Sequence, residues 1–128
     1  MGKSFEDLKV WHRAIDLTVL VYEFTRTLPK EETYGLSAQM RRAAVSVASN
    51  IAEGSVRGTR RDFRQFVKLA QGSNSELQTQ LIICHRLQYG TEESYRTVRT
   101  LSNEVGKMLS ALSKYLTKEI KSGATTSN

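Results

Sequence analysis

Seven basic side chains gather in one stretch of the sequence, and the chemistry they could perform is the binding of phosphate. Residues 41–68 contain these seven and two acidic side chains, so they carry +5 of the chain's formal net charge of +6. Six of the seven are arginines, whose planar guanidinium groups bind phosphate oxygens through paired hydrogen bonds. The basic residues are Arg41, Arg42, Arg57, Arg60, Arg61, Arg64 and Lys68.

Such a cluster predicts salt-sensitive and largely sequence-independent affinity for a nucleic acid or another polyanion. The spacing of Arg61, Arg64 and Lys68 would align them on one face of a helix, and antiparallel pairing could extend this strip toward Arg41 and Arg42. The alternative is a solvated helix face that serves solubility. The concentration of charge and the predominance of arginine favour binding, although few aromatic residues stand among the bases to stack on single strands.

The other reactive side chains do not combine into a catalytic or metal-binding pattern. A di-iron bundle site would place a glutamate three residues before a histidine, but position 82 is isoleucine and position 9 is lysine. Cys84 and His85 are adjacent, so on a helix they point about 100° apart and cannot act as nucleophile and base. The glycine-containing segment 54–58 lacks the Gly-Lys-Ser/Thr ending of a phosphate-binding loop. We therefore expect no enzymatic activity, no catalytic residues, no metal site and no cofactor.

Small residues form a second pattern, which overlaps the basic stretch. They allow a neighbouring helix to approach closely, and an interior glycine costs about 1 kcal/mol relative to alanine, so a packing role is expected. The pattern leaves open whether that neighbour belongs to the same chain or to another copy in a homo-oligomer. The polar members could fix the register of the helices or lie at a wet subunit boundary. The candidate packing residues are Ala44, Ser46, Ala48, Ser49, Asn50, Gly72 and Ser73.

Length and composition favour one helical domain in a reducing compartment. The chain has 128 residues, one proline and 8% aromatic residues, and it is long enough to bury a core without disulfides. Its single cysteine, Cys84, cannot form an internal disulfide. The longest run without charge, residues 43–52, is too short to span a bilayer, and no secretion leader is recognisable. We expect a cytoplasmic protein that does not enter membranes.

Two helices are expected in the first half of the chain. The first covers about residues 5–27 behind an N-cap at Ser4, and the second begins at residue 34 or 36 and ends at residue 53. Gly54 is expected to form a left-handed C-cap for the second helix. Apolar residues cover more than half the circumference of the first helix, which is wider than one core-facing stripe requires. The excess favours a contact between subunits.

Two more helices are expected in the second half of the chain. Thr59 and Thr91 are their predicted N-caps, and the helices should end near residue 89 and at residue 121. The third shows an apolar heptad series: Phe63, Phe66, Ala70, Ser73, Leu77, Gln80, Cys84 and Leu87. The fourth shows a series of three- and four-residue steps: Val98, Leu101, Val105, Met108, Leu112 and Tyr115. It ends in Lys114, Lys118 and Lys121, cations that suit the C-terminal end of a helix dipole.

Short connections between four long helices force neighbours to run in opposite directions. The expected fold is therefore all-α, an antiparallel up-down-up-down four-helix bundle. The bundle domain should cover residues 1–121, and the small polar residues 122–128 should form a disordered tail.

Five short motifs carry a resemblance to a known family. They are FEDLKVW at residues 5–11, YGL at 34–36, QMRRAAVS at 39–46, NIAEG at 50–54 and AQGS at 70–73, followed by Glu76. In their order and spacing, over about residues 5–117, the chain resembles the bacterial four-helix-bundle family known as 23S ribosomal RNA intervening-sequence proteins. This family is related to the accessory variability protein of diversity-generating retroelements. Val47 and Asn74 depart from the family pattern, and Asn74 makes the packing around the third helix harder to foresee.

The resemblance implies a closed homopentamer of four-helix bundles with a basic surface and a role in nucleic-acid binding. Our leading hypothesis is a non-enzymatic homo-oligomer that binds structured RNA or another nucleic acid through phosphates. The alternative is an adaptor whose basic strip docks an acidic or nucleic-acid-processing partner, such as a polymerase or a reverse transcriptase.

Overall fold

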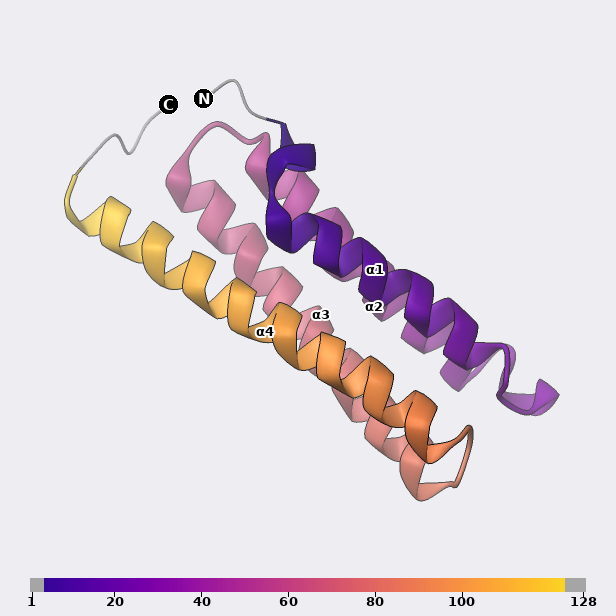
Figure 1. Ribbon diagram of the computed structural model, residues 1–128. Coiled ribbons are helices and arrows are strands. Elements are labelled where there is room, and N and C mark those ends of the chain that lie inside the picture. The colour runs from indigo at the N-terminus through magenta and orange to yellow at the C-terminus, as the bar shows by residue number, and fades with distance from the viewer. Residues whose placement is uncertain (1–3, 124–128) are drawn as a thin grey trace.

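The computed structural model describes residues 4–123 and contains four long helices (Figure 1). They are α1 (Lys9–Thr25), α2 (Leu36–Ser55), α3 (Arg60–Arg86) and α4 (Glu92–Lys121). Short 3-10 turns precede α1 (η1, Phe5–Asp7) and α2 (η2, Lys30–Glu32), and the described part of the chain contains no strand. Most of the expected disordered tail, residues 124–128, lies outside the described residues.

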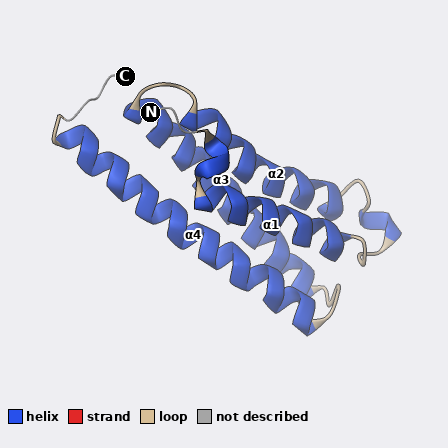
Figure 2. Cartoon of the chain, turned by 45° about the horizontal axis from the view of Figure 1, so that its top comes forward, coloured by secondary structure: helices blue, strands red, loops and turns tan. Residues whose placement is uncertain are grey.

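Each helix packs against two others, in the order α1, α2, α3, α4 and back to α1. Successive helices run in opposite directions (Figure 1; Figure 2). The start of α1, the α2–α3 connection and the end of α4 therefore lie together at what we call the α2–α3 end, and the α3–α4 connection lies at the opposite end. The predicted all-α, up-down-up-down antiparallel four-helix bundle is confirmed.

The core consists of aliphatic side chains contributed by all four helices. Leu17 of α1, Met40 and Ile51 of α2, Leu77 of α3 and Leu109 of α4 are completely buried. Burial of an aliphatic side chain of this size contributes about 1.5–3 kcal/mol relative to exposure, so this shared core is what holds the helices in place. No helix within residues 4–123 combines the length and the hydropathy needed to cross a membrane.

The N-caps of α3 and α4 form as their sequences predict. The Thr59 side chain accepts a hydrogen bond from the Asp62 backbone N–H at 3.1 Å. Thr91 accepts from the Ser94 backbone N–H at 3.0 Å, and Ser94 Oγ in turn accepts from the Thr91 backbone N–H at 3.1 Å, which completes a capping box. These caps fix where the two helices start.

The start of α1 differs from its prediction. Ser4 does accept a backbone hydrogen bond, from Glu6 N–H at 3.1 Å, but it caps the 3-10 turn η1. Leu8 is in an extended conformation, with φ −87° and ψ 121°, so the chain bends before the α-helix begins at Lys9. The bend lets the Phe5 ring pack on Trp11 with 5.1 Å between ring centres, a tertiary contact that a local capping pattern does not reveal.

The prediction that Gly54 forms a left-handed C-cap is wrong. α2 continues through Gly54 to Ser55, and the glycine with positive φ in this connection is Gly58, at 101°. A Cβ on Gly54 would stand 2.6 Å from the Cβ of Phe66, so the missing side chain lets α2 and α3 come close together. The glycine serves packing between two helices, and Gly58 makes the turn.

The predicted apolar series of α4 is correct in its first half and shifted in its second half. Val98, Leu101 and Val105 are buried, and Met108 and Leu112 are partly buried against the core. The fully buried residues after Val105 are Leu109, Leu116 and Ile120, whereas Tyr115, the last member of the predicted series, is 53% exposed. A straight helix drifts by about 20° per heptad against a strict 3.5-residue repeat, so over 30 residues the core-facing position moves to the next residue.

Candidate nucleic-acid interface

Five of the seven predicted phosphate-binding residues lie together at the α2–α3 end of the bundle. Arg57 stands in the connection after α2, and Arg60, Arg61, Arg64 and Lys68 occupy the first turns of α3. We call these five residues the basic patch. The capped start of α3 and the close packing of α3 on α2 fix their positions.

Two arginines of the basic patch are paired with carboxylates of the same chain. Arg57 Nη2 lies 2.8 Å from Glu53 Oε2, and its guanidinium stands 4.7 Å from the centre of the Phe66 ring. Arg60 Nη2 lies 3.7 Å from Glu119 Oε1 of α4. Such partly exposed pairs are weak, typically below about 1 kcal/mol, so they lower the local positive charge without preventing contact with a phosphate.

The other three members of the basic patch keep their charge uncompensated. Within residues 4–123, no ion pair involves Arg61, Arg64 or Lys68. Arg64 reaches across to α4, where its Nη1 donates to Thr117 Oγ1 at 3.3 Å. The positive charge of the patch is thus centred on the face that α3 shares with α4.

The end of α4 adds lysines to this face. Lys114, Lys118 and Lys121 line a shallow groove together with Ser113 and Thr117. In the part of the chain that the structure describes, none of these lysines takes part in an ion pair. We did not predict that they would adjoin the basic patch. The short α3–α4 connection could have predicted this position, because it determines which residues of α3 and α4 lie opposite each other.

Arg41 and Arg42 lie apart from the basic patch. The Arg41 guanidinium stands 4.6 Å from the centre of the Tyr22 ring, and its Nε donates to Thr25 Oγ1 at 2.8 Å, so Arg41 joins α2 to α1. Arg42 is exposed and lines a polar groove between α2 and α3 that also contains Gln80. The strip expected along the bundle therefore does not pass through Arg41.

Most of the small and polar packing candidates make contacts within the chain. Ala44 and Ala48 are buried in the core. The hydroxyls of Ser46 and Ser73 are 2.8 Å apart and join α2 to α3, and Asn50 Nδ2 donates to the Ser46 carbonyl oxygen at 2.8 Å. The contact between Ser46 and Ser73 relates the register of α2 to that of α3, whereas the Asn50 hydrogen bond lies within α2.

Two packing candidates lie on the surface. Ser49 and Gly72 are exposed, and a Cβ placed on Gly72 would have no neighbour within 4 Å. Within this chain, neither residue supports close approach of another helix.

His85 and its neighbours form a small polar cluster at the opposite end of the bundle. The Nε2 atom of His85 lies 2.9 Å from Glu92 Oε1, and the His85 ring stacks on the Tyr95 ring with 3.9 Å between ring centres. The hydrogen bond from His85 lowers the pKa of the Glu92 carboxyl. No group of three or more His, Cys, Asp or Glu side chains suited to a metal ion occurs within residues 4–123.

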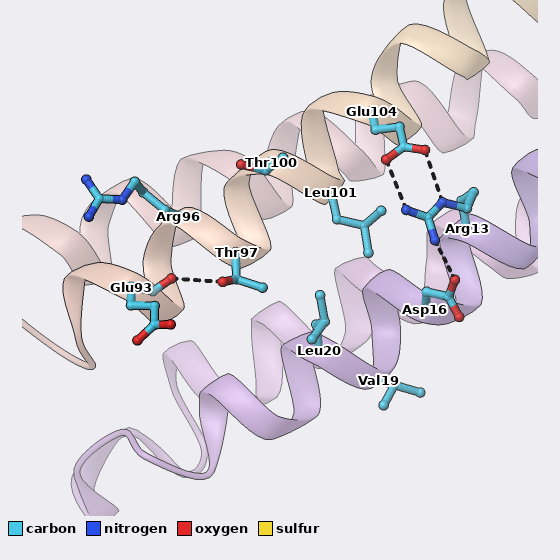
Figure 3. Close-up of a pocket in the computed structure, with 10 residues that line it drawn as sticks. All are labelled: Arg13, Asp16, Val19, Leu20, Glu93, Arg96, Thr97, Thr100, Leu101 and Glu104. Carbon is cyan, nitrogen blue, oxygen red and sulfur yellow. Dashed lines mark hydrogen bonds and ion pairs between the residues drawn. The ribbon is translucent and has the colours of Figure 1, made fainter.

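A groove between α1 and α4 has a different character from the basic patch (Figure 3). Leu20 and Leu101 point toward each other across it, and Arg13 donates to the Glu104 carboxylate through Nε at 3.1 Å and Nη2 at 3.0 Å. This hydrogen bonding lowers the pKa of Glu104. The acidic and basic side chains of this groove offset each other, so it offers no site for a polyanion.

Comparison with known proteins identifies a family. The family model described as 23S rRNA-intervening sequence protein matches residues 6–111. A crystal structure of a protein of unknown function from the S23 ribosomal protein family of Bacteroides thetaiotaomicron superposes with a TM-score of 0.77. The two chains are 24% identical, and the match covers 82% of this chain and 98% of the other. The comparison with curated proteins gives no match. At this identity, the structural similarity supports the fold alone.

Proposed function

The chain belongs to the family of 23S rRNA-intervening sequence proteins, and we propose that it binds RNA through the phosphate backbone without catalysing a reaction. The supporting observation is the uncompensated positive charge of Arg61, Arg64 and Lys68 on one exposed face. Guanidinium and ammonium groups in such a cluster replace the counterions of a polyanion, so affinity falls steeply with salt. The protein would act in the cytoplasm, on structured RNA.

We also propose that the protein is a homo-oligomer. α1 carries a stripe of large apolar side chains on its outer face, in which Ile15 is 37%, Val19 52% and Tyr22 36% exposed. We call these three residues the α1 stripe. Contact between copies would remove this apolar surface from water. The relation to the accessory variability protein of diversity-generating retroelements, which the sequence resemblance implies, favours five copies. Five copies would bring five times the chain's formal charge of +6 to one particle, so weak contacts would add.

Binding of the purified protein to ribosomal RNA fragments tests the proposed RNA function. We expect a complex at low ionic strength that dissociates as salt is added. The double variant Arg61→Gln/Arg64→Gln removes two phosphate contacts. The fall of log affinity with log salt should therefore become less steep, with the magnitude of the slope reduced by about 1.4–1.8. The matched control Arg26→Gln/Lys30→Gln removes the same charge from the opposite end of the bundle and should change the slope little.

Failure of the wild-type protein to bind RNA at low ionic strength would rule out this function. A partner protein recovered with the wild-type chain after nuclease treatment, but lost with Arg61→Gln/Arg64→Gln, would support the alternative function. In that case the basic patch would dock a polymerase or a reverse transcriptase.

A further inference from the structure

A further groove, between α3 and α4, has a lining suited to a nucleic-acid strand. Its volume is 710 Å³, and Gln71, Gln78 and Asn103 line it together with Lys107 and Lys114. Every lining residue is basic, polar and neutral, or small, and none is acidic. The groove therefore combines positive charge with neutral hydrogen-bonding groups, which the α1–α4 groove does not.

Hydrogen bonds across the two helices hold this groove in shape. Asn74 and Ser102 bond to each other at its base, with Asn74 Nδ2 donating to the Ser102 carbonyl oxygen at 3.0 Å and Ser102 Oγ donating to Asn74 Oδ1 at 2.8 Å. Gln78 Nε2 donates to Asn103 Oδ1 at 2.8 Å and to Ser102 Oγ at 2.9 Å, which leaves Gln78 Oε1 and Asn103 Nδ2 as the amide atoms that can contact a ligand. Gly106 leaves room for this network, because a Cβ there would stand 3.2 Å from Asn74 Nδ2. The base is therefore a fixed polar surface rather than a gap that the core could fill.

The α3–α4 groove continues into the basic patch. Lys114 lines this groove and also the shallow groove that contains Lys118 and Lys121. Arg64 of the basic patch contacts Thr117, which lines the shallow groove. From Lys107 to Lys121 the lysines follow α4 for about 21 Å, at 1.5 Å per residue. Charges spaced over this length can follow a phosphate backbone.

We propose that the α3–α4 groove binds a single-stranded segment of RNA. Lys107 and Lys114 would contact phosphates, and the Gln71 amide, Gln78 Oε1 and Asn103 Nδ2 would contact base edges or 2′-hydroxyls. This inference rests on the proposed RNA function and assigns a further site to it. An unpaired strand can present its base edges to side chains at the base of a groove, whereas in a duplex those edges lie in the grooves of the RNA itself.

Fluorescence anisotropy with short labelled oligonucleotides tests the inference. The probes are a single strand of about 12 nucleotides, within the range that strand-binding domains cover, and a duplex of the same length. We expect the wild-type protein to bind the single strand more tightly. Lys107→Gln/Lys114→Gln should weaken that binding by about tenfold or more and lower its salt slope by about 1.4. The control Arg26→Gln/Lys30→Gln has the same net charge and should bind nearly as wild type. Thermal unfolding checks that each variant is folded.

The outcomes separate this inference from the function on which it rests. Binding by Lys107→Gln/Lys114→Gln with the affinity and salt slope of the control would overturn the groove site and leave RNA binding by the basic patch intact. Wild-type preference for the duplex would do the same. Absence of binding to either probe and to ribosomal RNA fragments would overturn the groove site together with the proposed function.

Discussion

The Cys84 thiol lies in the core between α3 and α2, where its Sγ is 3.7 Å from the Sδ of Met40. Burial, with a smaller contribution from the negative charge of Glu32, raises the pKa of this thiol from 9.0 to about 11. Because thiolate is the reactive form, a buried thiol with a raised pKa is chemically inert near neutral pH. The location agrees with the place of Cys84 in the predicted apolar series of the third helix.

We expect native Cys84 to react with a water-soluble disulfide reagent at neutral pH far more slowly than the same protein unfolded in guanidinium chloride. The raised pKa also predicts a pH effect. The stability that it reflects is complete below the unfolded pKa near 9 and is lost as pH rises through about 11. Spectrophotometric thiol titration measures the reaction, and denaturant unfolding between pH 8 and 11 measures the stability. Rapid labelling of the folded protein would contradict this placement of the thiol.

Individual arginines show how far sequence reasoning reaches at the residue scale. Concentrated charge identifies residues 41–68 as the candidate interface, but it cannot give the partner of each side chain. Arg41 packs on the Tyr22 ring and Arg60 forms an ion pair with Glu119, and both partners belong to other helices. The positions of the partners depend on helix register, which residue type alone does not contain.

At the scale of helices, the α2–α3 pair depends on a glycine with a specific packing role. Gly54 faces Phe66 so closely that the Gly54→Ala substitution would force the helices apart. Overpacking of this kind costs about 1–3 kcal/mol, which outweighs the gain of about 1 kcal/mol in helix propensity. We expect Gly54→Ala to lower the free energy of unfolding, as measured by chemical denaturation.

Gly72 provides the matched control for Gly54. It also lies inside a helix, but a Cβ there meets nothing within 4 Å. Gly72→Ala should therefore gain helix propensity without strain and raise the free energy of unfolding by up to about 1 kcal/mol. A change of the same sign in the two variants would contradict the packing role of Gly54.

Helix register explains which parts of the fold and of the site the sequence could provide. Thr59 and Thr91 predict where α3 and α4 begin, because capping is a local interaction. The short connection between these helices then pairs residues about equally distant from residue 90, and Arg64 does contact Thr117. The same rule could have placed Lys114 and Lys118 beside the basic patch. The same rule does not predict that Asn74 hydrogen-bonds to Ser102, because a shift of one residue between the two helices would break this contact.

At the scale of the whole molecule, the two proposals use surfaces on different helices. The α3–α4 face carries Arg61, Arg64 and Lys68, which form no ion pair within residues 4–123, whereas α1 presents the apolar α1 stripe. Assembly through α1 would leave the α3–α4 face of each copy accessible to RNA. Linked copies bind a long polyanion with a higher effective concentration than separate ones, so assembly and RNA affinity should change together.

Val19→Asp tests this coupling, because Val19 is 52% exposed and lies in the middle of the α1 stripe. The carboxylate would be desolvated in a contact between copies but hydrated in a free chain, so the variant should be monomeric and still helical. Light scattering should give a multiple of 14.5 kDa for the wild type, five times that mass for a pentamer, and about 14.5 kDa for Val19→Asp. Val56→Asp, at a site that is 63% exposed in the α2–α3 connection, makes the same chemical change outside the stripe and should keep the wild-type mass. Because Val19→Asp should not assemble, its affinity for long RNA should be lower than that of the wild type. Its affinity for a short single strand should change little. A Val19→Asp protein with the wild-type mass would show that α1 does not form the contact between copies.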